Sequence, residues 1–157
     1  MVEHDGNIIV CRKAERCDIE TLTELLCELY VKHSKAELFD ENKALFADSN
    51  QIFFLAYVGD NPVGVCHCAL RNEYINGKEY DGPAGYLEAI YVKPDFRLKG
   101  IASALVSACE VWAGKNGCRE FLSDCLLDNI DSYNFHLHLG FFETERCIFF
   151  RKELISP

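Results

Sequence analysis

The sequence lacks any apolar run long enough to cross a membrane. A bilayer span needs roughly 18 or more consecutive apolar residues, and no stretch of the chain approaches that length. The opening segment, MVEHDGNIIV, also lacks the basic and then apolar pattern of a secretory signal. We therefore expect no membrane partner and a cytoplasmic location.

Positive charge is scarce. The chain has 16 lysine and arginine residues against 25 aspartate and glutamate residues, which gives a net charge of −9. A nucleic acid backbone requires a cationic protein surface, so we expect no nucleic acid partner. Cationic ligands would be attracted, although acidity is also an ordinary means of keeping a protein soluble.

Cysteine, by contrast, is abundant, with nine residues. Six of them lie within apolar runs: Cys11, Cys66, Cys68, Cys109, Cys125 and Cys147. This placement is typical of buried thiols in a reducing compartment and implies no disulfides. Side chains alternate along a strand, so His67 faces away from the thiols on either side of it, and their spacing does not suit tetrahedral zinc. We expect no metal site, and we interpret Cys125 as a buried thiol that carries no acyl group.

The length and composition favour one globular domain spanning residues 1–157. About half of the residues are hydrophobic, at 49%, which is enough to bury a substantial core. We find no repeats, linkers or low-complexity tracts.

Helical periodicity is clearest in two segments. Asp18 stands at the N-cap position ahead of leucines at three-and-four spacing, and residues 101–112 keep one apolar face until Asn116-Gly117 ends the helix. Shorter helices are expected near residues 40–47 and 132–138.

Strand patterns lie between these helices. The turn signal GDNP separates two apolar runs that form an antiparallel hairpin. The expected strands cover residues 8–10, 52–58, 62–71, 85–92, 120–127 and the region ending in 147–154. The mixed order predicts an α/β (α+β mixed) fold with helices on both faces of a mixed sheet.

The segment RLKGIA, residues 97–102, joins an expected strand to an expected helix. It could be a polar turn with a glycine near a helix start. It could also cradle a phosphate group, because Gly100 lets the backbone approach, the helix start offers free N–H groups, and Arg97 and Lys99 add positive potential.

In its context this segment resembles the Arg/Gln-x-x-Gly-x-Gly/Ala loop of the GNAT N-acetyltransferases. SDCLLDN and NFHLHLGF follow it at the family's distances. A narrower set of matches is similar to the aminoglycoside 6′-N-acetyltransferases: YING, LEAIYV, GCRE, SD and ETER. The resemblance implies a GNAT fold, with a central, mostly antiparallel sheet of six to seven strands flanked by about four helices.

The resemblance implies acetyl-CoA as cosubstrate, with its pyrophosphate on the loop. Main-chain groups of the preceding strand end would pair with the pantetheine arm, and one amide there would polarise the thioester oxygen. The implied contacts are Ile90, Tyr91, Val92, Arg97, Leu98, Lys99, Gly100, Ile101 and Ala102. Asn129 matches a family asparagine that is either a cofactor contact or a helix cap.

Glu88 interrupts an apolar strand, so it must be paired, desolvated or aimed into a wet cleft. A primary ammonium must lose a proton before it can attack, and Glu88 is our candidate to bind it, as base or as anchor. A structural partner such as a lysine is the alternative. By resemblance, Asp124 also meets the substrate's amines, unless it only caps a turn.

Three further residues are candidates by resemblance. Tyr74 and Glu79 match positions that help line the acceptor site. His136 stands where most family members carry a tyrosine thought to protonate the departing sulfur; it could act as that acid or be a core histidine. Tyr133 is a second candidate for the acid.

We therefore expect direct acetyl transfer in a ternary complex to the 6′-amine of an aminoglycoside, a polycationic small molecule. The acceptor could also be a polyamine or a protein N-terminus, and a non-catalytic acyl-CoA-binding module is a rival of another class. The resemblance and the apolar segment CIFF favour a homodimer.

Overall fold

The computed structural model describes the backbone of residues 2–4, 7–72, 74–75, 78–79 and 82–154, and the side chains of 8–72 and 82–154. Its main sheet has six strands in the order β1-β2-β3-β4-β7-β8. These strands are β1 Val2–His4, β2 Asn7–Lys13, β3 Gln51–Val58, β4 Asn61–Arg71, β7 Ala84–Val92 and β8 Phe121–Leu122. All neighbours pair antiparallel except β7 and β8, which are parallel, so the expected mixed, mostly antiparallel sheet is confirmed.

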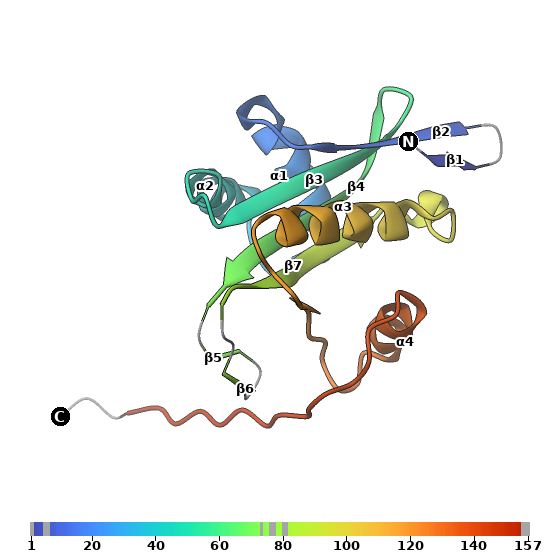
Figure 1. Ribbon diagram of the computed structural model, residues 1–157. Helices are drawn as coiled ribbons and strands as arrows, with labels where there is room; N and C mark the ends of the chain where they lie inside the picture. Colours follow the sequence, from blue (N-terminus) through green and yellow to red (C-terminus); the bar gives the residue numbers. More distant parts are fainter. Residues whose placement is uncertain (1, 5–6, 73, 76–77, 80–81, 155–157) are drawn as a thin grey trace.

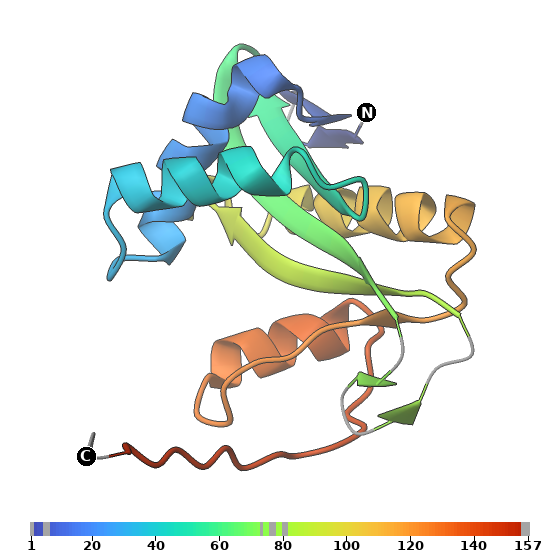
Figure 2. The same cartoon turned by 90° about the vertical axis from the view of Figure 1, so that its left-hand side faces the viewer.

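Helices cover both faces of this sheet (Figures 1 and 2). They are α1 Ile19–Leu29, α2 Lys35–Leu45, α3 Ile101–Lys115 and α4 Ile130–His138. The 3-10 turns η1 Arg16–Asp18 and η2 Pro94–Phe96 and the separate ribbon of β5 Tyr74–Ile75 with β6 Lys78–Glu79 complete the regular structure of the described residues. The expected central sheet of six strands flanked by four helices is confirmed for the described residues.

Strand alternation divides the apolar side chains between two cores. On one face, α1 packs against residues such as Leu55, Val65 and Tyr91. On the other, α3 packs against a cluster that includes Cys66, Cys68 and Leu87. The alternation at 66–68 therefore turns the two thiols towards α3 and leaves His67 on the face that α1 and α2 cover, so the predicted opposition of His67 to both thiols is confirmed.

Local polar contacts set where the helices begin. The second helix starts at Lys35, earlier than predicted, because Ser34 and Glu37 form a capping box. The Asn42 amide donates to the Thr23 hydroxyl at 3.0 Å and ties α2 to α1 inside the core. Asp18 does hold the N-cap position of α1, but its carboxylate accepts from Arg12 and from the Glu15 amide instead of capping that helix.

Two strand predictions at the C-terminal end differ from the structure. Of residues 120–127 only Phe121–Leu122 pair, because the chain then leaves β7. The expected strand within 147–154 is wrong: residues 141–154 have no regular secondary structure, and Cys147, predicted to be buried, is exposed. Figure 1 shows this tail running away from the sheet.

Candidate active site

A β-bulge places Glu88. In the β4–β7 ladder, His67 lies opposite Ala89 whereas Cys68 lies opposite Leu87, so Glu88 is the extra residue of the pair. A bulge interrupts the alternation of side chains. Leu87 therefore joins the α3 core, while Glu88 and Ala89 both face the α1–α2 side. The carboxylate that looked out of place in an apolar strand is directed out of the core by this one irregularity.

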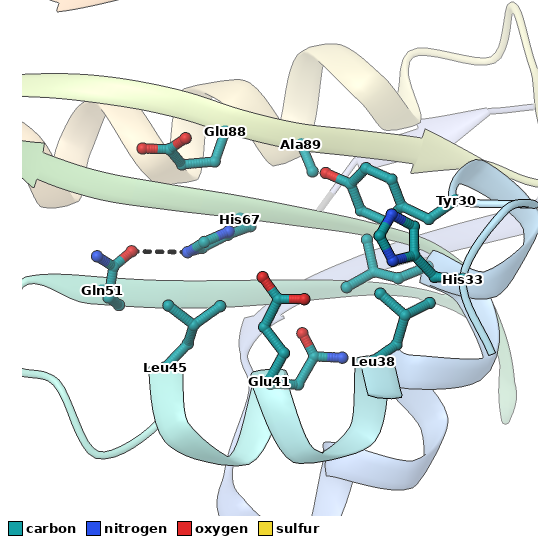
Figure 3. A pocket seen from close by; sticks show the side chains of 11 residues that line it. Tyr30, His33, Leu38, Glu41, Leu45, Gln51, His67, Glu88 and Ala89 are labelled. Atoms are coloured by element: carbon teal, nitrogen blue, oxygen red, sulfur yellow. Dashed lines mark hydrogen bonds between the residues drawn. The ribbon is translucent and has the colours of Figure 1, made fainter. Parts of the chain in front are cut away.

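Glu88 opens into a pocket of about 350 Å³ between the sheet and helices α1 and α2. In Figure 3, Gln51, His67 and Glu88 project from the strands, and Tyr30, His33 and Glu41 come from the α1–α2 side, with the Glu88 carboxylate turned away from Tyr30 and His33. Asn42 is also polar, and three leucines and Ala89 form the apolar part of the wall, so the pocket is lined mostly by polar groups. The full lining is Leu26, Tyr30, His33, Leu38, Glu41, Asn42, Leu45, Gln51, His67, Glu88 and Ala89.

The pocket is negatively polarised. Burial raises the pKa of Tyr30, and the charges of Glu41, Glu88 and Asp124 raise it further. One phenol thus senses the two carboxylates that line the pocket, on α2 and β7, and a third, Asp124, in the segment that follows β8. Such a concentration of one sign of charge in a cleft attracts ligands of the opposite sign.

His67 adds no positive charge to this field at neutral pH. Burial, with a contribution from Arg71, lowers the pKa of His67 to about 4. The ring stacks on Phe53, with centroids 4.3 Å apart, and its Nε2 lies 2.7 Å from Gln51 Oε1. His67 is therefore a neutral, fixed wall of the pocket.

Arg71, at the end of β4, binds both oxygens of Glu88. Its Nε donates at 2.9 Å and its second guanidinium nitrogen at 2.7 Å. The guanidinium also lies 3.5 Å from the centroid of the Tyr86 ring, and the Tyr86 hydroxyl donates to Asp124. Glu88 thus has a structural partner, an arginine in place of the lysine considered above, and still borders the pocket. Arg71 and Tyr86 connect the two predicted carboxylates.

His136 is held by two hydrogen bonds near the end of β8. Its Nδ1 lies 2.6 Å from the Ser132 carbonyl oxygen, so that nitrogen carries the proton. Its Nε2 lies 2.8 Å from Ser123 Oγ, which in turn donates towards the Leu87 carbonyl at 3.3 Å. His136 therefore reaches the β7–β8 boundary through the Ser123 hydroxyl. Tyr133 instead donates to Glu143 at 3.0 Å in an exposed contact.

Strands β7 and β8 separate after two residue pairs, Gly85 with Phe121 and Tyr86 with Leu122. Beyond that point the described part of the chain places no strand beside Glu88–Val92 on this side of β7. We call these diverging strands the wedge. On this side of β7 the main chain of Ile90, Tyr91 and Val92 has no strand partner among the described residues, so main-chain groups there can pair with an extended ligand arm.

The RLKGIA loop lies just past the end of β7. Gly100 adopts the left-handed backbone conformation, with φ 77°, and directly precedes α3. Leu98 adopts the same conformation, with φ 60°, and its side chain is fully exposed. A left-handed non-glycine residue is strained, and such residues cluster at ligand sites. Arg97 Nε donates to the Val92 carbonyl at 2.9 Å, which fastens the loop to the strand end.

This loop fits a diphosphate. The first N–H groups of α3, from Ile101 and Ala102, have no partner within the helix and point along its dipole, and alternating left-handed residues turn neighbouring amides to one side. The side chain of Lys99 adds positive charge beside Phe96.

The positions of the remaining predicted residues say less about the site. Tyr74 and Glu79 lie opposite each other in the β5–β6 ribbon, but their side chains fall outside the described residues. Asn129 caps α4 by accepting from the Ser132 amide at 3.0 Å.

Sequence reasoning missed Arg71, Tyr86, Gln51, Glu41 and Tyr30. The hairpin prediction put Arg71 at a strand end, and aligning the hairpin with 85–92 would have placed it near Glu88. The residues on α1 and α2 carried no such signal, because no local pattern fixes which helix covers which face.

Comparison with known proteins gives consistent results. Residues 19–141 match the model of the acetyltransferase (GNAT) family. The aminoglycoside N(6′)-acetyltransferase type 1 of Acinetobacter haemolyticus is 36% identical, over 91% of this chain and 97% of that protein. The structure of AAC(6′)-Iy in complex with the bisubstrate analog CoA-S-monomethyl-acetylneamine is 31% identical with a TM-score of 0.87, covering 94% of this chain and 99% of that one. AAC(6′)-Ih from Acinetobacter baumannii is 33% identical with a TM-score of 0.85, over the same shares.

Proposed function

The chain belongs to the acetyltransferase (GNAT) family, and we propose that it transfers acetyl from acetyl-CoA to the 6′-amine of aminoglycosides. The observation that carries this proposal is the acidic pocket built on the bulge at Glu88, directly beside the wedge between β7 and β8. It brings a site for a cation next to a site for an extended thioester, in a chain whose relatives bear that activity.

The acceptor's ammonium groups would be held by Glu88 and Asp124, with Glu41 extending the field across the pocket. Tyr74 and Glu79 would add to the acceptor site from the β5–β6 ribbon. Glu88 then takes the proton that the 6′-ammonium must lose before its nitrogen can attack the thioester carbonyl, directly or through a water.

The wedge and the loop would hold acetyl-CoA. Backbone amides of residues 98–102 would bind the pyrophosphate with help from Arg97 and Lys99, and the main chain of residues 90–92 would pair with the pantetheine arm. An amide of that strand would polarise the thioester oxygen. Asn129 would support the cofactor through α4.

The departing thiolate needs a proton, which we assign to His136. In the imidazolium form of His136 both ring nitrogens carry a proton, and Nε2 would pass one to Ser123 Oγ while the hydroxyl proton moves to sulfur, which leaves the ring neutral. Protons then balance: Glu88 gains the amine proton and the His136 side supplies one to the thiol.

Two properties of the whole protein are also proposals. Residues 1–157 would form one domain that works in the cytoplasm; no helix among the described residues is long and apolar enough to span a bilayer. The protein would act as a homodimer, which the exposed C-terminal tail supports.

The tail, residues 141–154, exposes five large apolar side chains: Phe142, Ile148, Phe149, Phe150 and Leu154. Their exposed fractions run from 77% to 93%. A monomer rarely exposes so many large apolar side chains in one short segment, and β8 leaves one edge of the main sheet open. A second copy offers the same edge and the same tail, so a two-fold arrangement can cover both.

Replacing Phe149 by aspartate should convert the dimer to a monomer, because a charge cannot enter an apolar interface without a large desolvation cost. Light scattering should give twice the 17.9 kDa chain mass for the wild type and 17.9 kDa for the variant. The matched control is Val111→Asp, an exposed apolar residue on α3 that should leave the dimer intact. A monomeric wild type at micromolar concentration contradicts the proposal.

The function itself is tested by free-thiol release from acetyl-CoA with kanamycin and with its 6′-hydroxy analogue. We expect turnover with kanamycin and a rate at background with the analogue, since the analogue lacks the attacking amine. Equal rates on both would refute the 6′ assignment. Turnover only with a polyamine or an N-terminal peptide would assign another acceptor, and binding of acetyl-CoA without turnover on any amine would favour a non-catalytic module.

A further inference from the structure

Arg71 occupies the space between the two carboxylates assigned to the acceptor. It donates to both oxygens of Glu88, stacks on Tyr86, and Tyr86 holds Asp124. Burial pulls the pKa of Arg71 down, but the hydrogen bond to Glu88 and the charges of Glu88, Tyr86 and Asp124 raise it overall. The guanidinium is thus a permanent cation that belongs to the chain itself.

An acceptor ammonium would make the same contacts. It is a compact cation that donates to carboxylate oxygens, and a cation lying on the Tyr86 ring is favourable in the same way. We propose that Arg71 is an internal competitor: it binds Glu88 in the free protein and leaves when a cationic acceptor arrives. This inference rests on the proposed function and adds to it a determinant of which amines can bind.

The exposure of the two side chains is consistent with such an exchange. The side chain of Arg71 is 40% exposed and that of Glu88 is 23% exposed, so the ion pair lies at the rim of the pocket. Ion pairs in contact with water are weak, and the guanidinium regains hydration when it swings outward. Its departure frees both oxygens of Glu88, one to bind the ammonium and one to receive its proton.

The exchange sets a threshold on the acceptor. Displacement of Arg71 costs the same for every amine, because it precedes contact with Glu88. A monoamine gains only that one contact, whereas a polycation also reaches Glu41 and Asp124. The internal cation therefore weakens the binding of every amine by the same factor and leaves the ratio of their affinities unchanged. A monoamine, which makes one contact, then falls below useful affinity at concentrations where a polycation still binds.

The test is calorimetric binding of kanamycin and of cyclohexylmethylamine, a monoamine, in the absence of acetyl-CoA. The apparent affinity is the intrinsic affinity multiplied by the fraction of protein in which Glu88 is free to bind. If that fraction is about one-tenth in the wild type, Arg71→Gln should lower both Kd values about tenfold. Arg71→Lys keeps the charge but loses the two-pronged contact and the ring stacking, so its Kd should lie between the two. The KM for kanamycin should fall in parallel in Arg71→Gln.

Lys115→Gln is the matched control, since it also removes one positive charge but lies at the end of α3, on the opposite face of the sheet. Its Kd values should equal those of the wild type. Unchanged or weaker binding by Arg71→Gln, in protein whose melting shows it folded, overturns the inference while kanamycin turnover by the wild type leaves the proposed function standing. If Arg71→Gln does not fold, Arg71→Lys decides alone: binding no tighter than wild type overturns the inference. No turnover by the wild type removes both.

Discussion

Replacing Glu88 by glutamine is expected to lower kcat for aminoglycoside acetylation by about 10²–10⁴-fold near neutral pH, the range that general base catalysis contributes. Glutamine keeps the size of the side chain and can still accept a hydrogen bond. It cannot take up the proton of the 6′-ammonium, and it leaves the charge of Arg71 uncompensated beside the pocket.

The pH dependence separates a base from an anchor. If Glu88 is the base, the Glu88→Gln rate should recover as pH rises, because more of the amine is already neutral. If Glu88 only binds the ammonium, KM rises and kcat persists. Initial rates of thiol release across pH provide both readings. Glu110→Gln, which removes one exposed carboxylate from α3, should match the wild type; a normal kcat in Glu88→Gln contradicts the assignment.

Replacing Gly85 by alanine is expected to destabilise the protein by about 1–3 kcal/mol, the usual cost of overpacking. A Cβ at this position would stand 2.6 Å from Phe121 Cδ2 and 2.7 Å from the Ala113 Cβ, closer than carbon atoms can approach. Gly85 is also the residue that pairs with Phe121, so relief of the clash must move β8 or α3. The change acts where the wedge begins.

Thermal unfolding measures this effect, at about 2–4 °C for each kcal/mol in a chain of this size. Gly114→Ala is the matched control with the opposite sign. A Cβ there meets nothing within 4 Å, and alanine is favoured over glycine within a helix by about 0.5–1 kcal/mol. A Gly85→Ala variant whose melting temperature equals or exceeds that of the wild type would contradict the prediction, because it would show that β8 can shift without a cost in stability. The KM for acetyl-CoA should also rise in Gly85→Ala, because the wedge is formed by the same two strands.

The site owes its geometry to two departures from regular pairing. The bulge at Glu88 places consecutive residues on one face of the sheet, and the separation of β7 from β8 leaves main-chain groups along the adjacent wedge. Acetyl transfer needs a proton acceptor and a thioester side by side. Both irregularities fall within a few residues of the same strand, so the two ligands would meet there.

The prediction of a strand in the C-terminal tail was wrong for an identifiable reason. Apolar runs such as CIFF predict a strand only if an edge is available to pair with, and within the described chain that segment meets none. An apolar sequence pattern shows that burial of the segment would be favourable. It does not show which surface covers the segment.

By itself the sequence determined the order of the four helices and the longer strands β2, β3, β4 and β7, the glycine corner at 97–102 and the unusual position of Glu88. These depend on neighbours a few residues away, through periodicity, capping and turn chemistry. Only the tertiary structure decided that Arg71 meets Glu88, that Tyr86 joins them to Asp124, and that α1 and α2 close the pocket. Those contacts depend on strand register and on which helix covers which face, and a one-residue slip or bulge redirects every side chain beyond it.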